Sequence, residues 1–263
     1  MHGVRGEAGV SDKEKDSESM QYATLENAQK CVDNAFRLYD DASKTSAPTK
    51  AALIELGIEE LAKGLLISFK TPEIKKISLG GILKIDDILK GQSGGDFAAS
   101  LRGHKISDFK THNHEKKLNT IQFILDGAGA FYSIYKDNLA PLYDVLSKTY
   151  GGASTEPHGS DSKKIDEAFS SLSYMDVGKL YKIKEDGFYV DFERGESISP
   201  EERKFNSVGI IMVFFVLYST LNLLIRMCSG GELIDIIMDQ KAILGRFYDI
   251  IYGSKNTGSG GLV

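Results

Sequence analysis

The chain has 263 residues and a formal net charge of -5, from 32 basic and 37 acidic side chains. This length allows one large or two small domains with a hydrophobic core, and the acidic balance argues against a protein coated for nonspecific nucleic-acid binding, while leaving room for a local basic cleft. Its two cysteines, Cys31 and Cys228, lie far apart within helical patterns, so neither a disulfide framework nor a zinc knuckle is expected and a reduced cytoplasm is the simplest setting.

The two ends of the chain have a polar composition. Residues 1–19 contain no apolar segment of the kind found in signal peptides, so we expect a disordered N-terminal lead. Residues 253–263 are rich in Gly and Ser and predict a flexible tail. Between them, residues 20–252 are expected to form a single helical domain, in which residues 151–200 make a loop and a β-hairpin excursion.

An amphipathic helix is predicted from Met20 to about Lys44, because apolar residues recur there every three or four positions. Beside its apolar stripe lie Asn34 and Asp41, seven residues apart. Both are read either as the solvated flank of a surface helix or as polar groups that face an internal pocket. A short break at Ser46–Pro48 follows, so the next helix should run antiparallel to the first.

The stretch from Ala51 to Phe69 is apolar on nearly every side and predicts a buried helix. Three charged residues interrupt it, Glu59, Glu60 and Lys63. Ionised groups are expensive to remove from water unless they are paired or used. Two explanations stay open: an ion pair between Glu59 and Lys63, which are four residues apart, or a polar pocket lined by one face of a central helix.

The next segment changes from mixed to strongly basic composition. Thr71, Pro72 and Glu73 have the pattern of a helix start, and residues 75–95 predict short helical pieces and a loop. Residues 101–118 then hold three of the five histidines, and in an acidic chain this is where an anion is most expected to bind. The basic side chains and histidines of this stretch are Arg102, His104, Lys105, Lys110, His112, His114, Lys116 and Lys117.

A long helix is predicted from about His114 to Ser147, with a kink or break at Pro141. His114 lies on its apolar stripe near the N-terminus, where the helix dipole favours a neutral imidazole and the exposed N–H groups favour an anion. Such a histidine is either a hydrogen-bonded core residue or a functional one, and the basic neighbours favour function. His112 and His114 diverge on a helix and no third ligand is evident, so no metal site is expected.

The C-terminal part is predicted to contain a small hairpin followed by helices. A weak helical pattern covers residues 165–172, and residues 181–195 alternate around Asp186 and Gly187, a pair typical of hairpin turns. Ser199–Glu202 form a capping box with proline at the first helical position, which predicts a helix start. A final helix is predicted from Glu232 to Tyr252.

Residues Val208 to Ile225 contain no charge and reach the minimum length of a membrane span. Clustered polar residues around Ser219 and the adjacent Arg226 favour a buried central or dimer-interface helix instead.

Four short blocks in this order resemble the AbiV type of abortive-infection protein, a branch of the all-helical HEPN superfamily. They are Asn34-Ala35 with Asp41-Ala42, Ile58–Lys63 (IEELAK), His114–Leu118 (H-x-x-K-L), and Phe188–Phe192 (FYVDF) followed by Ser199–Glu202. The resemblance implies an all-α, antiparallel HEPN-like helical bundle, which here carries a small β-hairpin insertion. It also implies a homodimer formed beside a polar groove and a role in stopping phage multiplication at the infected cell's expense.

Many HEPN relatives are metal-independent ribonucleases whose signature is an arginine followed four to six residues later by a histidine. This chain departs from that signature, because Arg102 is too close to His104 and too far from His112 or His114.

The first functional hypothesis is a metal-independent ribonuclease or RNA-targeting toxin that blocks translation in infected cells. His114 would act as general base or acid on the RNA 2′-hydroxyl, because imidazole titrates near neutrality. Lys117 and Lys63 would hold the phosphate, and Glu59 or Glu60 would orient a histidine or a lysine. The residues expected to bind substrate or support the groove are Asn34, Asp41, Arg102, His112 and Lys116. No metal or other cofactor is expected.

A second hypothesis keeps the bundle without the chemistry, as a binding module that senses or sequesters a phage protein or a translation component; the departure from the nuclease signature supports it. A third, a membrane-tethered effector, rests on residues 208–225. The expected partners are a second copy of the chain, RNA or the translation machinery, and a phage-encoded activator, whereas a membrane is not expected.

Overall fold

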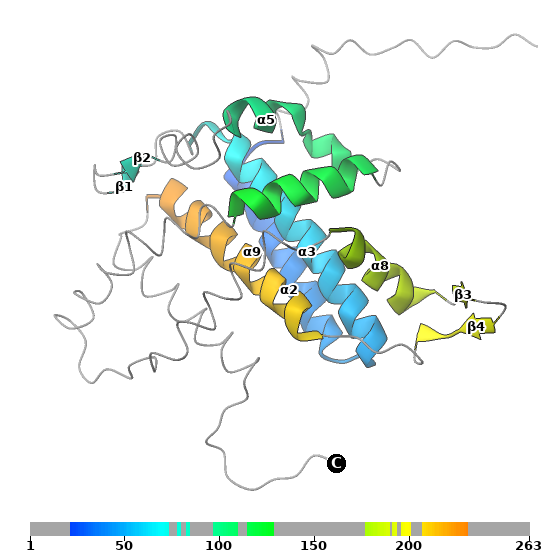
Figure 1. The fold of residues 1–263 in the computed structure, drawn as a ribbon. Helices are drawn as coiled ribbons and strands as arrows, with labels where there is room; N and C mark the ends of the chain where they lie inside the picture. Colours follow the sequence, from blue (N-terminus) through cyan, green and yellow to red (C-terminus); the bar gives the residue numbers. More distant parts are fainter. Residues whose placement is uncertain are drawn as a thin grey trace, which may run out of the picture.

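The computed structural model describes residues 22–73, 78–79, 83–84, 97–109, 115–128, 177–189, 191–193, 196–200 and 207–230. These residues form a mainly α-helical structure, in agreement with the predicted all-α class (Figure 1). The helices are α2 (Leu25–Ala42), α3 (Ala47–Lys70), α5 (Phe97–Gly103), the 3-10 helix η2 (Ile106–Phe109), a helix described over residues 115–128, α8 (Val177–Phe188) and α9 (Ser207–Cys228). Two short antiparallel strand pairs join β1 (Ser78–Leu79) to β2 (Leu83–Lys84) and β3 (Asp191–Glu193) to β4 (Glu196–Ile198).

Helix α2 begins later than its periodicity predicts. The Thr24 hydroxyl accepts a hydrogen bond of 3.2 Å from the backbone N–H of Asn27, so Thr24 is the N-cap residue and the predicted start at Met20 is too early. The buried face of α2 carries the predicted three-four spacing. Buried members of this face are Ala28, Cys31, Val32, Ala35 and Ala42.

Helix α3 is the central element of the bundle. Its N-cap is Ser46, Pro48 lies in its first turn, and its C-cap residue Thr71 donates a hydrogen bond of 2.8 Å to the Ser68 carbonyl. Helices α2, α8 and α9 and the 3-10 helix η2 all pack against α3, so little of its surface is left for solvent (Figure 1). The predicted buried helix is therefore confirmed, including its stripe of Ile54, Ile58, Leu61 and Leu65.

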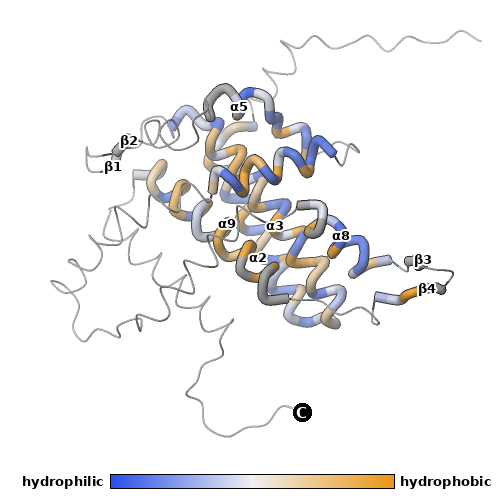
Figure 2. The backbone as a smooth tube through the Cα atoms, viewed as in Figure 1, coloured by the Kyte–Doolittle hydropathy of each residue, from blue (hydrophilic) through white to orange (hydrophobic). Residues whose placement is uncertain are grey.

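Two glycines of α3 let neighbouring helices approach closely. A Cβ at Gly57 would lie 2.7 Å from Phe214 Cε2 of α9. A Cβ at Gly64 would lie 2.6 Å from Leu221 Cδ2 of α9 and 2.9 Å from Cys31 Cβ of α2. These contacts bring α2, α3 and α9 together in one hydrophobic core, and hydrophobic residues gather along α3 and α9 in Figure 2.

Helix α9 contains residues 208–225, the uncharged stretch that reaches the minimum length of a membrane span. Its side chains from Val213 to Leu217 are buried in the core, where Phe214 stacks on Tyr39 of α2 with ring centroids 5.1 Å apart. Among the residues that the structure describes, no helix combines the length and apolar character needed to cross a bilayer. In this structure α9 packs against α2 and α3, as predicted for a buried central helix.

The hairpin predicted at Asp186 and Gly187 is wrong in position, because both residues lie inside helix α8. A Cβ at Gly187 would lie 2.6 Å from the Pro48 carbonyl oxygen, so this glycine serves close packing on α3 and forms no turn. The hairpin is instead formed by β3 and β4, with Asp191 opposite Ile198. The short strands β1 and β2 occupy four positions within residues 75–95, for which short helical pieces and a loop are predicted, and the other residues of that stretch lie outside the described part of the chain.

Several predictions lie outside the described residues. They concern the lead at 1–19, the tail at 253–263, residues 129–150 with Pro141, the loop and weak helix within 151–176, the second half of the capping box at 201–202, and the final helix at 232–252.

Candidate functional site

A single carboxylate of α3 joins three helices. Glu59 Oε1 accepts a hydrogen bond of 2.8 Å from Lys184 Nζ of α8, and Glu59 Oε2 forms an ion pair with Lys117 Nζ of helix 115–128. The two lysines therefore occupy different oxygens of the same group. Charge-assisted hydrogen bonds of this kind are about twice as strong as those between neutral groups.

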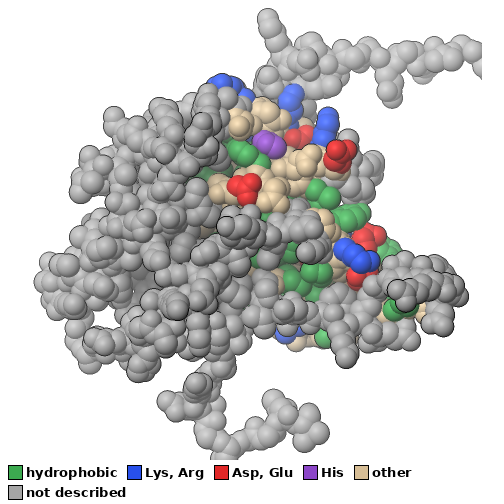
Figure 3. Space-filling model, viewed as in Figure 1, with side chains coloured by type: hydrophobic (Ala, Val, Ile, Leu, Met, Phe, Trp, Pro, Cys, Tyr) green, Lys and Arg blue, Asp and Glu red, His purple; other side chains and the backbone are tan. Residues whose placement is uncertain are grey.

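These three side chains are largely withdrawn from solvent. Their exposed fractions are 9% for Glu59, 13% for Lys184 and 16% for Lys117. A pair at this depth is screened far less than a surface pair, and removing one partner leaves an uncompensated buried charge. Basic and acidic side chains lie side by side over the region of α8 in Figure 3.

Glu55 lies one turn before Glu59 and is the most deeply buried acid of the group, with 2% of its surface exposed. Its Oε2 is 3.9 Å from Lys184 Nζ and has no hydrogen-bond partner within the described part of the chain. Burial, followed by the charge of Glu59, holds the pKa of Glu55 well above its usual value, and the two nearby lysines oppose this shift only in part. Glu55 therefore keeps a proton under conditions where an ordinary glutamate is ionised.

Lys184 also lies over an aromatic ring of its own helix. Its Nζ is 4.6 Å from the ring centroid of Tyr181, within cation–π range. Burial acts to lower the pKa of Lys184, but the carboxylates of Glu55 and Glu59 outweigh it, and the pKa is raised. Lys184 therefore stays charged. We call the five residues Glu55, Glu59, Lys117, Tyr181 and Lys184 the Glu59 cluster.

Glu60 and Lys63 form a separate ion pair. Lys63 Nζ donates to Glu60 Oε1 at 2.6 Å, and both side chains are about a quarter exposed. The alternative of an ion pair between Glu59 and Lys63 is therefore wrong in this structure. Consecutive helix residues point about 100° apart, so adjacent acids serve different partners. Glu60 and Lys63 lie near Cys31 of α2, whose thiol pKa burial raises to about 11.

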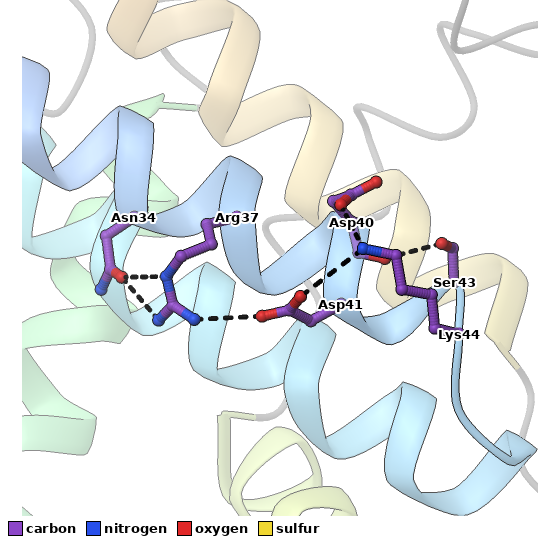
Figure 4. A network of polar contacts seen from close by, with 6 residues as sticks. All are labelled: Asn34, Arg37, Asp40, Asp41, Ser43 and Lys44. Carbon is purple, nitrogen blue, oxygen red and sulfur yellow. Dashed lines mark hydrogen bonds and ion pairs between the residues drawn. The ribbon is translucent and has the colours of Figure 1, made fainter.

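Asn34 and Asp41 belong to a solvent-exposed network on α2, which Figure 4 shows. Arg37 donates to Asn34 Oδ1 at 2.9 Å and to Asp41 Oδ2 at 3.0 Å, and Lys44 pairs with Asp40 at 2.7 Å. The Arg37 side chain is 62% exposed and that of Asp41 45%. This arrangement matches the prediction of a solvated flank, and exposed pairs of this type contribute little to stability.

His104 anchors the basic stretch to the bundle. Its Nδ1 lies 2.9 Å from Thr120 Oγ1, and its ring stacks on Phe123 with centroids 4.3 Å apart and planes 14° apart. Burial lowers the pKa of His104, and nearby Lys70 acts in the same direction while Asp108 opposes both. His104 thus joins the segment after α5 to helix 115–128 as a neutral, stacked residue.

The remaining predicted site residues divide between the surface and the undescribed part of the chain. Arg102 and Lys116 are exposed. His112 and His114 lie outside the described residues, so the expected meeting of His114 with Glu60 and Lys63 stays a prediction.

Sequence reasoning missed Glu55, Tyr181 and Lys184. A signal for Glu55 was available, because it precedes Glu59 by four residues and so shares its face of the helix. Lys184 stands in the alternating pattern of residues 181–195, which predicts strands, whereas the structure places it in helix α8. Among the described residues, no group of three or more His, Cys, Asp or Glu side chains is placed to hold a metal ion.

The Glu59 cluster combines two ammonium groups, the carboxylate of Glu59 and the carboxyl group of Glu55, whose pKa is raised. Such a set is suited to holding an anion or to fixing the relative positions of three helices. Comparisons of the whole chain with family models, curated proteins and solved structures return no match.

Proposed function

We propose that this protein is an RNA-targeting toxin of the abortive-infection type, which acts as a homodimer and cleaves RNA without a metal ion. The observation that carries this proposal is the ion pair between Glu59 and Lys117. It joins the IEELAK block to the H-x-x-K-L block, two of the four blocks on which the AbiV resemblance rests. Short motifs far apart in the sequence thus supply two partners of one buried contact.

The proposed chemistry centres on His114. A helical position three residues before Lys117 lies on the same face as Lys117, so a continuous helix would bring the imidazole toward the Glu59 cluster. The imidazole would remove the proton of an RNA 2′-hydroxyl, and a lysine ammonium would stabilise the charge that develops on the phosphate. Glu59 would orient Lys117.

The test incubates the purified protein with labelled total RNA in the presence of EDTA. Wild-type protein should cleave the RNA, and His114→Ala should lower the rate by about 10²–10⁴, the usual contribution of a general acid or base. His158→Ala is the matched control, because His158 stands in a polar stretch of the sequence rich in Gly and Ser and has no proposed role. Absence of wild-type cleavage, or unchanged cleavage by His114→Ala, would overturn the nuclease proposal.

A second candidate function is a binding module for a phage protein or a translation component. The observation in its favour is that Lys117 and Lys184 already share Glu59, so the cluster serves as a buried junction of three helices without any catalysis. The chain also departs from the arginine–histidine spacing of HEPN nucleases. In this case the protein should inhibit cell-free translation while ribosomal and messenger RNA stay intact, and His114→Ala should inhibit equally well.

A further inference from the structure

Helix α2 and the turn after it carry a line of charged side chains on the face that points away from the core. These residues follow one another at steps of four and three positions, so they lie in one row along the helix. All of them are exposed, and their signs alternate strictly along the row. The C-cap residue Ser43 keeps helical backbone angles, so the row continues past the end of α2. We call this row the α2 charge stripe; it consists of Glu26, Lys30, Asp33, Arg37, Asp40 and Lys44.

The order of signs makes the α2 charge stripe complementary to itself when two copies of α2 run antiparallel. A two-fold axis at Ala35 brings each acid of one copy opposite a base of the other. A parallel arrangement in the same register would place like charges opposite each other. The pairs across this axis are Glu26 with Lys44, Lys30 with Asp40, and Asp33 with Arg37. The stripe has as many acids as bases, so it offers no excess charge to a polyanion or to a charged peptide, and a second copy is the partner that its pattern fits.

The middle of the stripe is not paired with itself within one chain. Asp33 and Arg37 are four residues apart, the spacing of a helical ion pair, yet Arg37 donates to Asn34 and Asp41 instead. Asp33 accepts a hydrogen bond of 2.9 Å from the neutral amide of Gln29, and no cation pairs with it among the described residues. Three of the five N–H donors of Arg37 are used. The other two are able to reach a carboxylate of a second copy, while Asn34 and Asp41 hold the guanidinium in place.

An exposed aromatic side chain lies beside the middle of the stripe. Phe36 is 49% exposed, and its ring centroid lies 6.1 Å from that of Tyr218 of α9. Phe36 stands one position from an axis at Ala35, so such an axis would bring the two Phe36 rings of a dimer close together and remove them from water. Interfaces between proteins commonly combine an aromatic centre with a charged surround. Figure 4 shows three residues of the stripe, Arg37, Asp40 and Lys44, on this helix.

We propose that this face of α2 is the interface of a two-fold homodimer, in which α2 packs antiparallel against α2 of a second copy. The inference rests on the proposed function, which includes a homodimer, and names the surface through which the two copies meet. Most of the contacts join exposed charges, so the dimer should dissociate more readily as the salt concentration rises.

The first experiment measures the dimer dissociation constant by sedimentation equilibrium. Asp33→Arg places two bases opposite each other and Arg37→Asp places two acids opposite each other, so each variant alone should raise the constant roughly tenfold or more. An equimolar mixture of the two variants should restore dimers, because the middle pairs between the two proteins again join an acid to a base. Both positions are exposed, and circular dichroism should show unchanged helix content.

The matched control is Asp126→Arg on helix 115–128. Asp126 is exposed like Asp33 and accepts a hydrogen bond of 3.0 Å from Gln122, which precedes it by four residues as Gln29 precedes Asp33. The change of charge and the lost hydrogen bond are therefore the same. Asp126→Arg should leave the dissociation constant unchanged, and an equal effect of both variants would show that overall charge, and not the α2 charge stripe, controls assembly.

The second experiment uses the wild-type protein. Unlabelled and heavy-nitrogen-labelled protein are mixed in equal amounts, and a carbodiimide joins carboxylates directly to amines. Peptide pairs that carry both isotopes come from two copies, and they should link Lys30 to Asp40 and Lys44 to Glu26. Within one helix Lys30 and Asp40 are about 15 Å apart along the axis, too far for a direct link. Links of Lys30 to Glu26 and of Lys44 to Asp40 should come from single chains, where these side chains are already paired.

The outcomes separate this inference from the proposed function. If the wild-type protein is a dimer, but the two variants dissociate as it does and no mixed-isotope link joins the stripe residues, the α2 interface is wrong and the homodimer stands. If the wild-type protein is a monomer throughout, both the interface and the homodimer are overturned. Cleavage of RNA in EDTA and its dependence on His114 are measured independently of either result.

Discussion

Lys184 donates a hydrogen bond of 2.8 Å to Glu59 across 125 positions of sequence. The contact ties α8, from the second half of the chain, to the central helix α3 of the first half, and Lys117 adds helix 115–128 to the same carboxylate. One acid and two bases therefore link three elements of the bundle. Buried ion pairs of this type are best understood as devices that select one arrangement, with a modest net effect on stability.

Lys184→Met should destabilise the protein by about 3 kcal/mol, at the low end of the range for breaking a buried pair, because Lys117 still neutralises Glu59. The measurement is the free energy of unfolding from urea titration. Lys182→Met should change it by less than about 1 kcal/mol, because that side chain is 59% exposed. Glu59→Gln should cost less in the Lys184→Met protein than in the wild-type protein, because it then leaves one buried lysine without its carboxylate and not two. Strict additivity of the two changes would show that the residues do not interact.

Glu55→Gln should change how stability depends on pH. The pKa of Glu55 is raised in the folded state, so above the ordinary glutamate value of 4.5 the folded protein binds more protons than the unfolded chain. Wild-type stability should therefore fall as pH rises from 4.5 through the folded-state pKa, and this contribution to the slope should vanish in Glu55→Gln. Urea unfolding at a series of pH values provides the test. Identical slopes in the two proteins would show that the pKa of Glu55 is not raised in the folded state.

Helices α2 and α3 could be predicted because the spacing of their apolar residues along the sequence identifies the buried face of each helix. Apolar residues three and four apart identify the face that packs, whichever partner covers it, and Ile54 to Leu65 are buried as their periodicity indicates. The choice between Glu59 and Glu60 was not predictable in this way. Both precede Lys63 at helical spacing, and only the positions of α8 and helix 115–128 decide which acid turns inward.

The position of the hairpin could not be predicted from the local sequence pattern. Asp186 and Gly187 form a favourable turn pair, yet tertiary packing on α3 holds both in a helix. Because Gly187 has no side chain, its backbone can lie close to Pro48. One sequence does not distinguish a glycine required for close approach of two helices from a glycine required for a turn. The same ambiguity predicts a strand at Lys184, where the structure has a helix.

Gly64→Ala should destabilise the bundle although alanine is the better helix former. The new Cβ would lie 2.9 Å from Cys31 Cβ and 2.6 Å from Leu221 Cδ2, so α2 or α9 must shift. Overpacking of this kind costs about 1–3 kcal/mol, which offsets or exceeds the roughly 1 kcal/mol gained in helix propensity. The comparison is Gly103→Ala at the end of α5, where a Cβ would meet nothing within 4 Å. Thermal unfolding should give a lower Tm for Gly64→Ala than for Gly103→Ala, and the reverse order would contradict the close packing.

The His104 imidazole should titrate below 6.5 in the folded protein, because burial lowers its pKa and the neutral ring stacks on Phe123. Proton NMR follows the imidazole signal over a pH series, with His104→Gln used to assign it. Phe123→Leu removes the stacked ring and opens one face of the imidazole to water, so the midpoint should move up toward 6.5. Stability linked to this residue is fully present above 6.5 and is lost as pH falls through the lowered pKa, because the unfolded chain then binds the additional proton. A midpoint that is the same in both proteins would show that the stacked ring is not what desolvates His104.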